Sequence, residues 1–184
     1  MTRAKRKVFP MNPTLTTTIA SPIGPLLLSA RDGALTGLQV HNQRHFRELP
    51  NDAVHDDVWF SDIKEQLDAY FTGDRRTFEV PLNLEGTDFQ RRVWAQLRAI
   101  PYGETISYGE LASRVGNARA SRAVGLANGR NPVSIIVPCH RVIGADGSLT
   151  GYGGGLERKT WLLAHEETIG RVGSSDRASH QLTH

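Results

Sequence analysis

The residue with the clearest potential for covalent chemistry is Cys139, the only cysteine of the chain, which precedes His140 and Arg141. A thiolate attacks carbon, and a neighbouring base or positive charge favours its formation. A lone cysteine also serves as a small core residue, and adjacent residues of a regular strand point to opposite faces. Pro138 interrupts such a strand, and Asn131 can hold a turn through its own side-chain hydrogen bonds. We therefore expect an irregular, specific turn around Cys139.

A carboxylate near the end of the chain is a candidate partner for this site. Glu166 follows Leu162 by four residues and Leu163 by three, so it shares the apolar face of the last predicted helix. A carboxylate that points inward needs a hydrogen-bond partner, and a histidine is a natural one. The alternative is a solvated charge near the helix end.

A third group of residues suggests a surface for nucleic acid. The segment 118–130 is predicted to be helical, with Arg119 and Arg122 outside its core-facing stripe. That stripe comprises Ala120, Ala123, Val124 and Ala127. Small residues surround the arginines, namely Ala118, Ser121 and Gly125. Such a helix can bring its backbone and arginines close to a duplex, although an ordinary solvated helix face would have the same pattern.

Composition narrows the class of protein without naming a function. The 184 residues, 39% of them hydrophobic, suit one or two globular domains. A single cysteine excludes an internal disulfide, and the seven histidines lack metal-ligand spacing, so we expect no metal. The net charge of +3 permits an acidic partner without establishing one. No apolar run matches a membrane span or a secretion signal, so we expect a cytoplasmic protein.

The first half of the chain predicts a sheet followed by a helix. Residues 1–12 are expected to form a flexible basic tail. Residues 15–40 alternate apolar runs with turn signals, which indicates an antiparallel β-meander. Residues 41–57 are polar and predicted to be loop, whereas residues 58–73 carry a helical apolar stripe. Residues 76–86 are predicted to be an extended connector, so a first domain spans residues 13–84.

The second half is predicted to be mostly helical. Thr87 and Gln90 form one expected capping box, and Ser107 and Glu110 a second. Asn117 is the expected cap of the helix at 118–130, and the succession of short helices resembles a helix-turn-helix.

After these helices come an apolar run, a glycine-rich loop and a last helix, at residues 133–137, 145–155 and 157–167. The second domain is predicted to span residues 85–170. Residues 171–184 are expected to form a flexible tail.

Several motifs together resemble the O6-alkylguanine-DNA alkyltransferases. They are PCHRV at residues 138–142, FQRRVWAQLRAIPYGETISYGELA, GNARASRAVGLANGRNP and YGGGLERKTWLLAHE. The resemblance covers residues 87–167 almost without gaps, and residues 13–84 in outline. It implies an α+β fold with two parts. The first is a ribonuclease H-like antiparallel β-meander with a helix, and the second is a helical winged helix-turn-helix domain with the active site.

The resemblance also implies catalytic roles. Cys139 would accept the alkyl group, and His140 would deprotonate it through a bound water. Glu166 would orient the histidine, and Asn131 would brace the turn. Tyr108 would hydrogen-bond the base and help guanine leave as a neutral species. Cys139, the water, His140 and Glu166 would form a proton relay similar to the catalytic triads of hydrolases.

The resemblance further implies how DNA is bound. Arg122 would enter the base stack in place of a damaged nucleotide that has rotated out, with the helix in the minor groove. The other implied DNA contacts are Arg119, Ser121, Ala123, Gly125 and Tyr108. The implied base pocket comprises Val142, Tyr152, Gly153, Gly154 and Lys159.

Three comparisons with the family refine these expectations. Gly153 stands where the family often has serine or alanine, which predicts a wider pocket with one hydrogen bond fewer. The cysteines with which some members bind zinc in the N-terminal domain are missing. Relatives that only bind lesions have tryptophan in place of the cysteine, whereas this chain keeps Cys139.

The implied function is direct reversal of alkylation damage in double-stranded DNA. O6-alkylguanine, and O4-alkylthymine as well, would lose the alkyl group irreversibly to Cys139, once per molecule and without a cofactor. We expect a monomer, with cooperative binding along DNA left open. One alternative is a non-catalytic lesion sensor or regulator, and another is a cysteine hydrolase that uses Cys139, His140 and Glu166.

Overall fold

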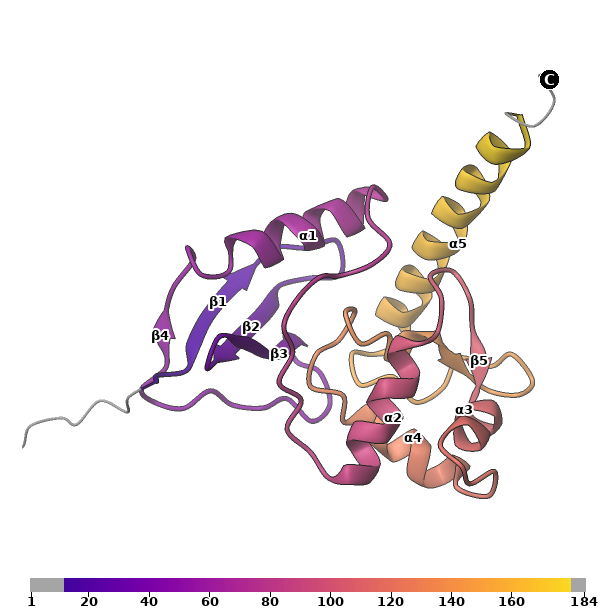
Figure 1. The fold of residues 1–184 in the computed structure, drawn as a ribbon, viewed down its shortest axis with the longest axis horizontal. Coiled ribbons are helices and arrows are strands. Elements are labelled where there is room, and N and C mark those ends of the chain that lie inside the picture. Colours follow the sequence, from indigo (N-terminus) through magenta and orange to yellow (C-terminus); the bar gives the residue numbers. More distant parts are fainter. Residues whose placement is uncertain (1–11, 180–184) are drawn as a thin grey trace, which may run out of the picture.

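The computed structural model describes residues 12–179, so nearly all of the predicted basic tail at residues 1–12 lies outside the described residues. An N-terminal half, residues 12–84, holds the main sheet, and a C-terminal half, residues 85–179, holds most of the helices. Figure 1 shows these halves side by side, with the last helix extending away from both.

The N-terminal sheet confirms the predicted meander. Strands β1 (Leu15–Ile19), β2 (Leu26–Arg31) and β3 (Ala34–Val40) pair antiparallel in sequence order. Asp32 and Gly33 join β2 to β3, and both adopt positive φ, 53° and 75°. This is the geometry that an Asp-Gly hairpin turn requires. The Asp-Gly pair therefore sets the β2–β3 hairpin locally.

Two features of this half differ from the sequence-based expectation. A two-residue strand, β4 (Val54–His55), pairs parallel with β1 inside the segment predicted to be loop. Both of its residues are exposed, so no apolar alternation marked it. Helix α1 (Ser61–Thr72) begins three residues later than predicted and ends at Gly73, whose φ is 89°. Its buried side packs Ile63, Leu67 and Tyr70 toward the core.

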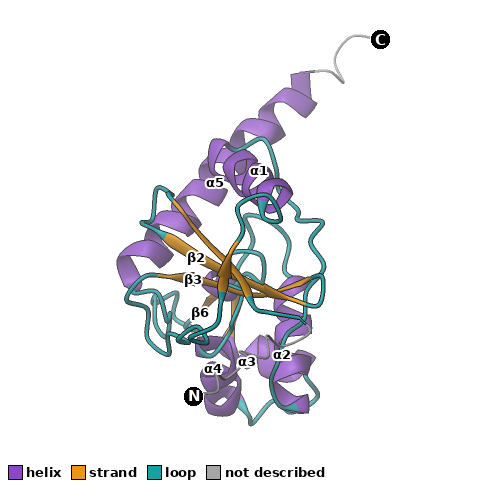
Figure 2. Cartoon of the chain, turned by 90° about the vertical axis from the view of Figure 1, so that its left-hand side faces the viewer, coloured by secondary structure: helices purple, strands orange, loops and turns teal. Residues whose placement is uncertain are grey.

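The C-terminal half gathers short helices around the active-site segment. It contains α2 (Asp88–Arg98), β5 (Ile106–Ser107), α3 (Tyr108–Arg114) and α4 (Ser121–Gly129). A 3-10 helix η1 (Cys139–Arg141), β6 (Val142–Ile143) and α5 (Leu156–Ser179) follow. Strands β5 and β6 pair parallel in a second, two-stranded sheet. Figure 2 shows α2, α3 and α4 grouped together on one side of the strands.

Helix capping follows the sequence closely. Thr87 and Gln90 form the predicted capping box of α2, with both hydrogen bonds present. Ser107 caps α3 by accepting from the backbone N–H of Glu110. The Glu110 side chain pairs with Arg114 one turn later instead of completing a second box. An ion pair along the helix therefore competes with the reciprocal capping bond.

The predicted start of α4 was wrong, and its predicted buried face was right only in part. The N-cap is Ala120, whereas Asn117 accepts from the backbone of Arg119 in a separate local turn. Arg119 therefore precedes the helix. Val124 and Ala127 are buried as expected, but Ala123 is exposed and Asn128 is buried. Small residues around the whole helix left its core-facing side ambiguous, and packing against α2 and α3 decided it.

The last helix is longer than predicted. α5 runs to Ser179, through the segment expected to be a flexible tail from residue 171, and residues 180–184 lie outside the described residues. Glycines at 170 and 173 lower helix propensity by about 1 kcal/mol each relative to alanine, but they do not forbid the conformation. No proline interrupts residues 156–179.

Candidate active site

Cys139 begins the 3-10 helix η1 and is buried, with 4% of its surface exposed. The Asn131 amide donates to the Cys139 sulfur at 3.1 Å and to the Val137 carbonyl at 2.7 Å. Its oxygen accepts from the Val133 N–H at 3.0 Å. One asparagine side chain thus spans the turn and touches the nucleophile, as expected for a residue that braces it.

The backbone before the cysteine holds an unusual conformation. Ile135 has a φ of +71°, which is rare for a β-branched residue and costs on the order of 1–3 kcal/mol. Such strain persists only where the surroundings impose it. Two hydrogen bonds hold this segment against β3. The Leu38 N–H donates to the Pro132 carbonyl and the Ser134 N–H donates to the Leu38 carbonyl, both at 2.9 Å. The N-terminal sheet therefore braces the segment that carries Cys139.

His140 and Glu166 meet in the interior, although 26 residues separate them. The Nε2 atom of His140 lies 2.9 Å from Oε1 of Glu166, and their side chains are 0% and 1% exposed. Glu166 points inward from α5, as the apolar face of that helix predicted. The sequence thus identified both members of a buried histidine–carboxylate pair.

Glu166 has further donors that the sequence did not identify. Arg141 donates through Nε to Oε2 at 2.8 Å and through Nη2 to Oε1 at 2.9 Å. The hydroxyl of Tyr70 donates to Oε1 at 2.8 Å, and the N–H of Gly103 donates to Oε2 at 3.1 Å. In the sequence, Arg141 stood out only because it lies two residues after Cys139. Tyr70 belonged to the apolar stripe of the predicted helix at residues 58–73, which gave it no chemical role.

The surroundings of this pair fix its protonation. Burial by itself would raise the pKa of Glu166, but hydrogen bonds and charges from His140 and Arg141 outweigh it and hold that pKa well below the usual range. Burial lowers the pKa of His140, against the opposing influence of Glu166. His140 is therefore neutral at neutral pH and Glu166 is ionised.

The hydrogen-bond pattern also fixes the tautomer of the imidazole. Because an ionised carboxylate only accepts, Nε2 carries the proton, and Nδ1 is left with a free lone pair. Nδ1 is buried and has no hydrogen-bond partner among the described residues. It is the atom available to receive a proton.

The thiol itself is held in its neutral form. Burial raises the pKa of Cys139, whereas the Asn131 hydrogen bond and the charge of Lys159 lower it in part. Lys159 is 0% exposed and donates to the carbonyls of Val142 and Thr150 at 2.6 and 2.8 Å. Burial lowers the pKa of Lys159 to about 8, with Cys139 opposing that shift. The nucleophile therefore needs a base during reaction, which His140 can supply.

A groove of about 940 Å³ runs beside this site. Among the predicted residues it is lined by Tyr108, Ser121, Arg122, Gly125, Tyr152 and Gly153. The Tyr108 hydroxyl donates to the Thr150 carbonyl at 2.9 Å, and burial raises its pKa, so it stays protonated. Arg122 and Ala123 are exposed on α4. The structure thus brings these six predicted residues to one groove, whereas the other five, Arg119, Ala123, Val142, Gly154 and Lys159, do not line it.

Gly153 has a different consequence from the one expected. A Cβ atom built there would lie 3.3 Å from the Gly129 carbonyl and 3.4 Å from the Arg44 carbonyl, so a side chain would be tight. The Arg44 N–H also donates to the Gly153 carbonyl at 2.7 Å. The missing side chain therefore lets neighbouring backbone approach, where a wider pocket was predicted.

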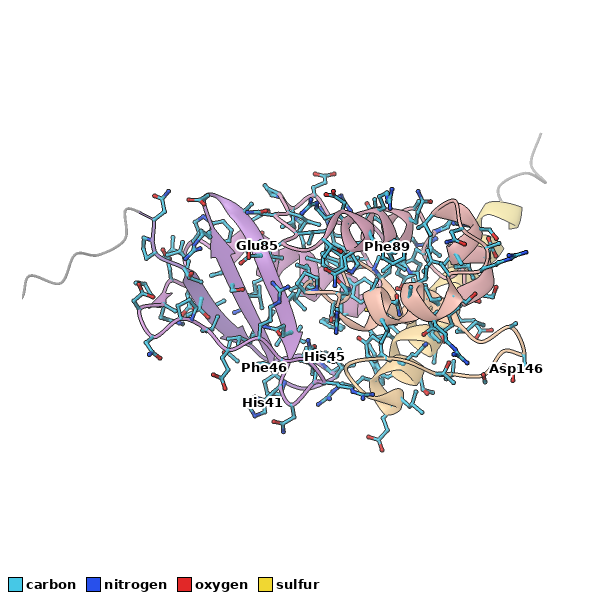
Figure 3. The ribbon with its side chains drawn as sticks, turned by 90° about the horizontal axis from the view of Figure 1, so that it is seen from below. His41, His45, Phe46, Glu85, Phe89 and Asp146 are labelled. Atoms are coloured by element: carbon cyan, nitrogen blue, oxygen red, sulfur yellow. The ribbon has the colours of Figure 1, made fainter. Side chains whose placement is uncertain are left out.

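Sequence reasoning missed three further residues of this region. Asn128 donates to the Cys139 carbonyl at 3.3 Å, and its place in the NGRNP motif was its only signal. Arg44 and His45 line the groove from the loop after β3, in a segment predicted only as polar loop. Figure 3 shows His45 at the end of the N-terminal half that meets the C-terminal half.

Within residues 12–179, no group of three or more His, Cys, Asp or Glu side chains is arranged to hold a metal ion. Every helix among the described residues is too short or too polar to cross a membrane.

Comparisons with known proteins agree with this geometry. Residues 14–84 match the family model "6-O-methylguanine DNA methyltransferase, ribonuclease-like domain", and residues 88–168 match the DNA binding domain of the same family. The methylated-DNA–protein-cysteine methyltransferase of Mycobacterium tuberculosis H37Rv is 54% identical over 151 residues, 82% of this chain and 91% of the relative. The methyltransferase of the same name from Methanosarcina acetivorans is 51% identical over 146 residues, 79% of this chain and 94% of the relative.

Solved structures show the same relationship. The M. tuberculosis O6-methylguanine methyltransferase matches with a TM-score of 0.77 and 52% identity, over 86% of this chain and 94% of that one. The M. tuberculosis protein in complex with DNA matches with a TM-score of 0.79 and 53% identity, over 84% and 94% of the two chains. Both halves of the chain and its reactive cysteine segment thus lie within one family. The chain belongs to the 6-O-methylguanine DNA methyltransferase family.

Proposed function

We propose that this protein repairs alkylated double-stranded DNA by moving the alkyl group from the O6 atom of guanine to the sulfur of Cys139. The observation that carries the proposal is the buried Cys139 turn beside a neutral His140, whose free Nδ1 is the proton acceptor. The names of the relatives agree, since they describe methyltransferases that act on methylated DNA and on a protein cysteine.

The transfer is a displacement at the alkyl carbon. The Cys139 thiol gives its proton, through a bound water, to Nδ1 of His140, and Glu166 stabilises the resulting imidazolium. The sulfur then forms a bond to the alkyl carbon while the bond from that carbon to O6 breaks. The electron pair passes to the guanine, which takes a proton from the Tyr108 hydroxyl and so leaves as a neutral species. The hydroxyl turns from the Thr150 carbonyl to the base for this step, and Tyr108 then regains a proton from the solvent.

Access to the lesion requires that the nucleotide leave the base stack. The alkylated atom is out of reach inside a duplex, and flipping costs a few kcal/mol, least for a weakened pair. We propose that Arg122 fills the gap in the stack from the DNA minor groove, which its exposure on α4 at the groove of the protein supports. Ser121 and Gly125 also line the groove, and together with the exposed Arg119 and Ala123 they are the proposed contacts to the DNA backbone.

The thioether product has no easy route back to a thiol, so each molecule acts once and uses no cofactor. O4-alkylthymine presents a comparable leaving group and is a second proposed substrate. We expect a monomer on DNA that works in the cytoplasm, and binding measurements at increasing protein density will show whether neighbours cooperate.

The test is the mass of the protein after incubation with duplex DNA that carries O6-methylguanine. We expect one methyl group in place of one proton, located on the peptide that contains Cys139, and no second turnover. The variant Cys139→Ala should bind the damaged duplex and gain nothing. An unchanged mass with tight lesion binding would identify a lesion sensor, and repeated ester or amide turnover without methylation would identify a hydrolase.

A further inference from the structure

Tyr70 joins the N-terminal half to the catalytic carboxylate. It lies on α1, is 0% exposed, and donates its hydroxyl to Oε1 of Glu166 at 2.8 Å. Its backbone carbonyl accepts from Nε2 of His165 at 2.8 Å, one residue before Glu166 on α5. Two hydrogen bonds therefore fix this residue against the helix that carries the carboxylate.

The tyrosine ring is itself held from several sides. Phe71, Phe78, Tyr102 and His165 have ring centres between 5.3 and 6.0 Å from that of Tyr70. Burial and the nearby Glu166 charge raise the pKa of Tyr70 well above its ordinary value. Its hydroxyl therefore keeps its proton and acts as a hydrogen-bond donor. The position and the donor character of this group are thus both fixed.

The hydroxyl competes with the catalytic histidine for one oxygen. Oε1 of Glu166 accepts from Tyr70, from Nε2 of His140 and from Nη2 of Arg141. A carboxylate oxygen has about two lone-pair directions, so three donors share them. Each added donor weakens the attraction of that oxygen for the proton on His140.

We propose that Tyr70 is a positioning residue for alkyl transfer, which fixes Glu166 and moderates its hold on His140 so that the imidazole stays neutral and able to accept the thiol proton. This inference rests on the proposed function. It gives the N-terminal half a part in the chemistry, through a residue that acts on His140 only by way of Glu166.

Other charged or titratable groups around His140 set the background for this effect. Glu166 and Lys159 face it from α5, and Arg141 and Cys139 lie beside it on η1. Tyr102, in the loop after α2, faces Glu166 and lies under the Arg141 guanidinium. Removal of the Tyr70 hydroxyl leaves all of these in place. It frees Oε1 to hold the protonated imidazole more strongly, which raises the pKa of His140.

The experiment compares Tyr70→Phe with the unchanged protein. The variant keeps the ring and its aromatic contacts, and thermal melting verifies its fold. We measure the single-turnover rate of methyl transfer from duplex O6-methylguanine as a function of pH. We expect the acid limb of the profile to move to higher pH, with rates on that limb lower by about threefold to tenfold and the plateau at higher pH nearly retained.

Tyr102→Phe is the matched control. It removes a buried hydroxyl that has no hydrogen-bond partner among the described residues, close to the same cluster. We expect its acid limb to match that of the unchanged protein. Equal profiles for Tyr70→Phe and the unchanged protein, or equal shifts in both variants, would overturn the proposal.

A second readout separates this proposal from the function itself. The imidazole nitrogen shifts of His140, followed by NMR through a pH titration without DNA, should show a higher pKa in Tyr70→Phe. An unchanged titration overturns the role of Tyr70 even if methyl transfer occurs. Absence of methyl transfer by the unchanged protein refutes the proposed function, and in that case the NMR shift still reports whether Tyr70 tunes His140.

Discussion

Individual side chains around Cys139 and His140 each make several hydrogen bonds. Asn131 holds the turn and also donates to the reactive sulfur. Arg141 follows His140 in sequence and, with two hydrogen bonds, balances the charge of the Glu166 carboxylate that also contacts the histidine. A buried carboxylate would be costly by itself, and this pairing satisfies it.

Arg122 has a role that can be tested at the scale of one residue. Arg122→Ala should slow repair of duplex DNA by about tenfold or more, because nothing then fills the vacated position in the stack. Flipping itself costs a few kcal/mol, and the variant no longer offsets that cost. Reaction with a free O6-alkylguanine base needs no flipping and should keep its rate. Single-turnover kinetics on both substrates measure the difference.

The matched control is Arg31→Ala, which removes an exposed arginine from the end of β2 in the N-terminal sheet. It should leave both rates unchanged. Equal losses on duplex and free base in Arg122→Ala would contradict the proposed role in the stack.

Secondary-structure elements position the site through a few tertiary contacts. Helix α2 contributes Trp94, whose indole N–H donates to the Ala127 carbonyl of α4 at 2.9 Å and so ties two helices together. Strand β3 holds the segment before Cys139 through Leu38. The reactive turn therefore depends on elements from both halves.

The start of α2 offers a test at the scale of an element. Thr87→Ala removes the capping box and should lower the free energy of unfolding by about 1 kcal/mol. The hydrogen bonds of the Thr87 cap are made with Gln90 and not with Cys139 or its partners. The rate of methyl transfer by the folded protein should therefore not change. Urea denaturation measures the stability, and Thr87→Ser, which keeps the accepting oxygen, is the control. A loss as large in Thr87→Ser would show that the cap is not the cause.

At the scale of the whole molecule, the buried relay couples stability to pH. The pKa of Glu166 lies well below its ordinary value of 4.5 in the folded protein. The contribution of ionised Glu166 to the free energy of unfolding is therefore complete above pH 4.5 and is lost as the pH falls below that value. Burial also lowers the pKa of His140 from 6.5, so the unfolded chain binds more protons below that pH, and stability falls in the same direction.

We accordingly expect the urea midpoint to decrease as the pH is lowered from 6.5, and to decrease further below 4.5. Glu166→Gln should have a lower midpoint at neutral pH and a shallower decrease below pH 4.5, since a neutral amide cannot titrate. The same dependence on pH in both proteins would show that another group is responsible.

Much of this architecture is encoded locally. Asp32-Gly33 specifies a hairpin, Thr87 and Ser107 mark two helix starts, and Leu162, Leu163 and Glu166 lie on one helical face. These signals act between residues a few positions apart, so the sequence alone predicts them. By contrast, β4 has two exposed residues and carried no apolar alternation, and the small residues on every side of α4 predicted a helix without settling its start or the whole of its buried face.

The sequence by itself determined the candidate nucleophile Cys139, the pairing of His140 with Glu166, the arginine-bearing helix and the family resemblance, because motif and periodicity record them. Only the tertiary structure decided that Tyr70 and Arg141 share Glu166, that β3 braces the strained turn, and that backbone carbonyls border the space beside Gly153. These are contacts between residues far apart in the chain or between backbone atoms. Their energies depend on distance and direction in space, which residue order does not record.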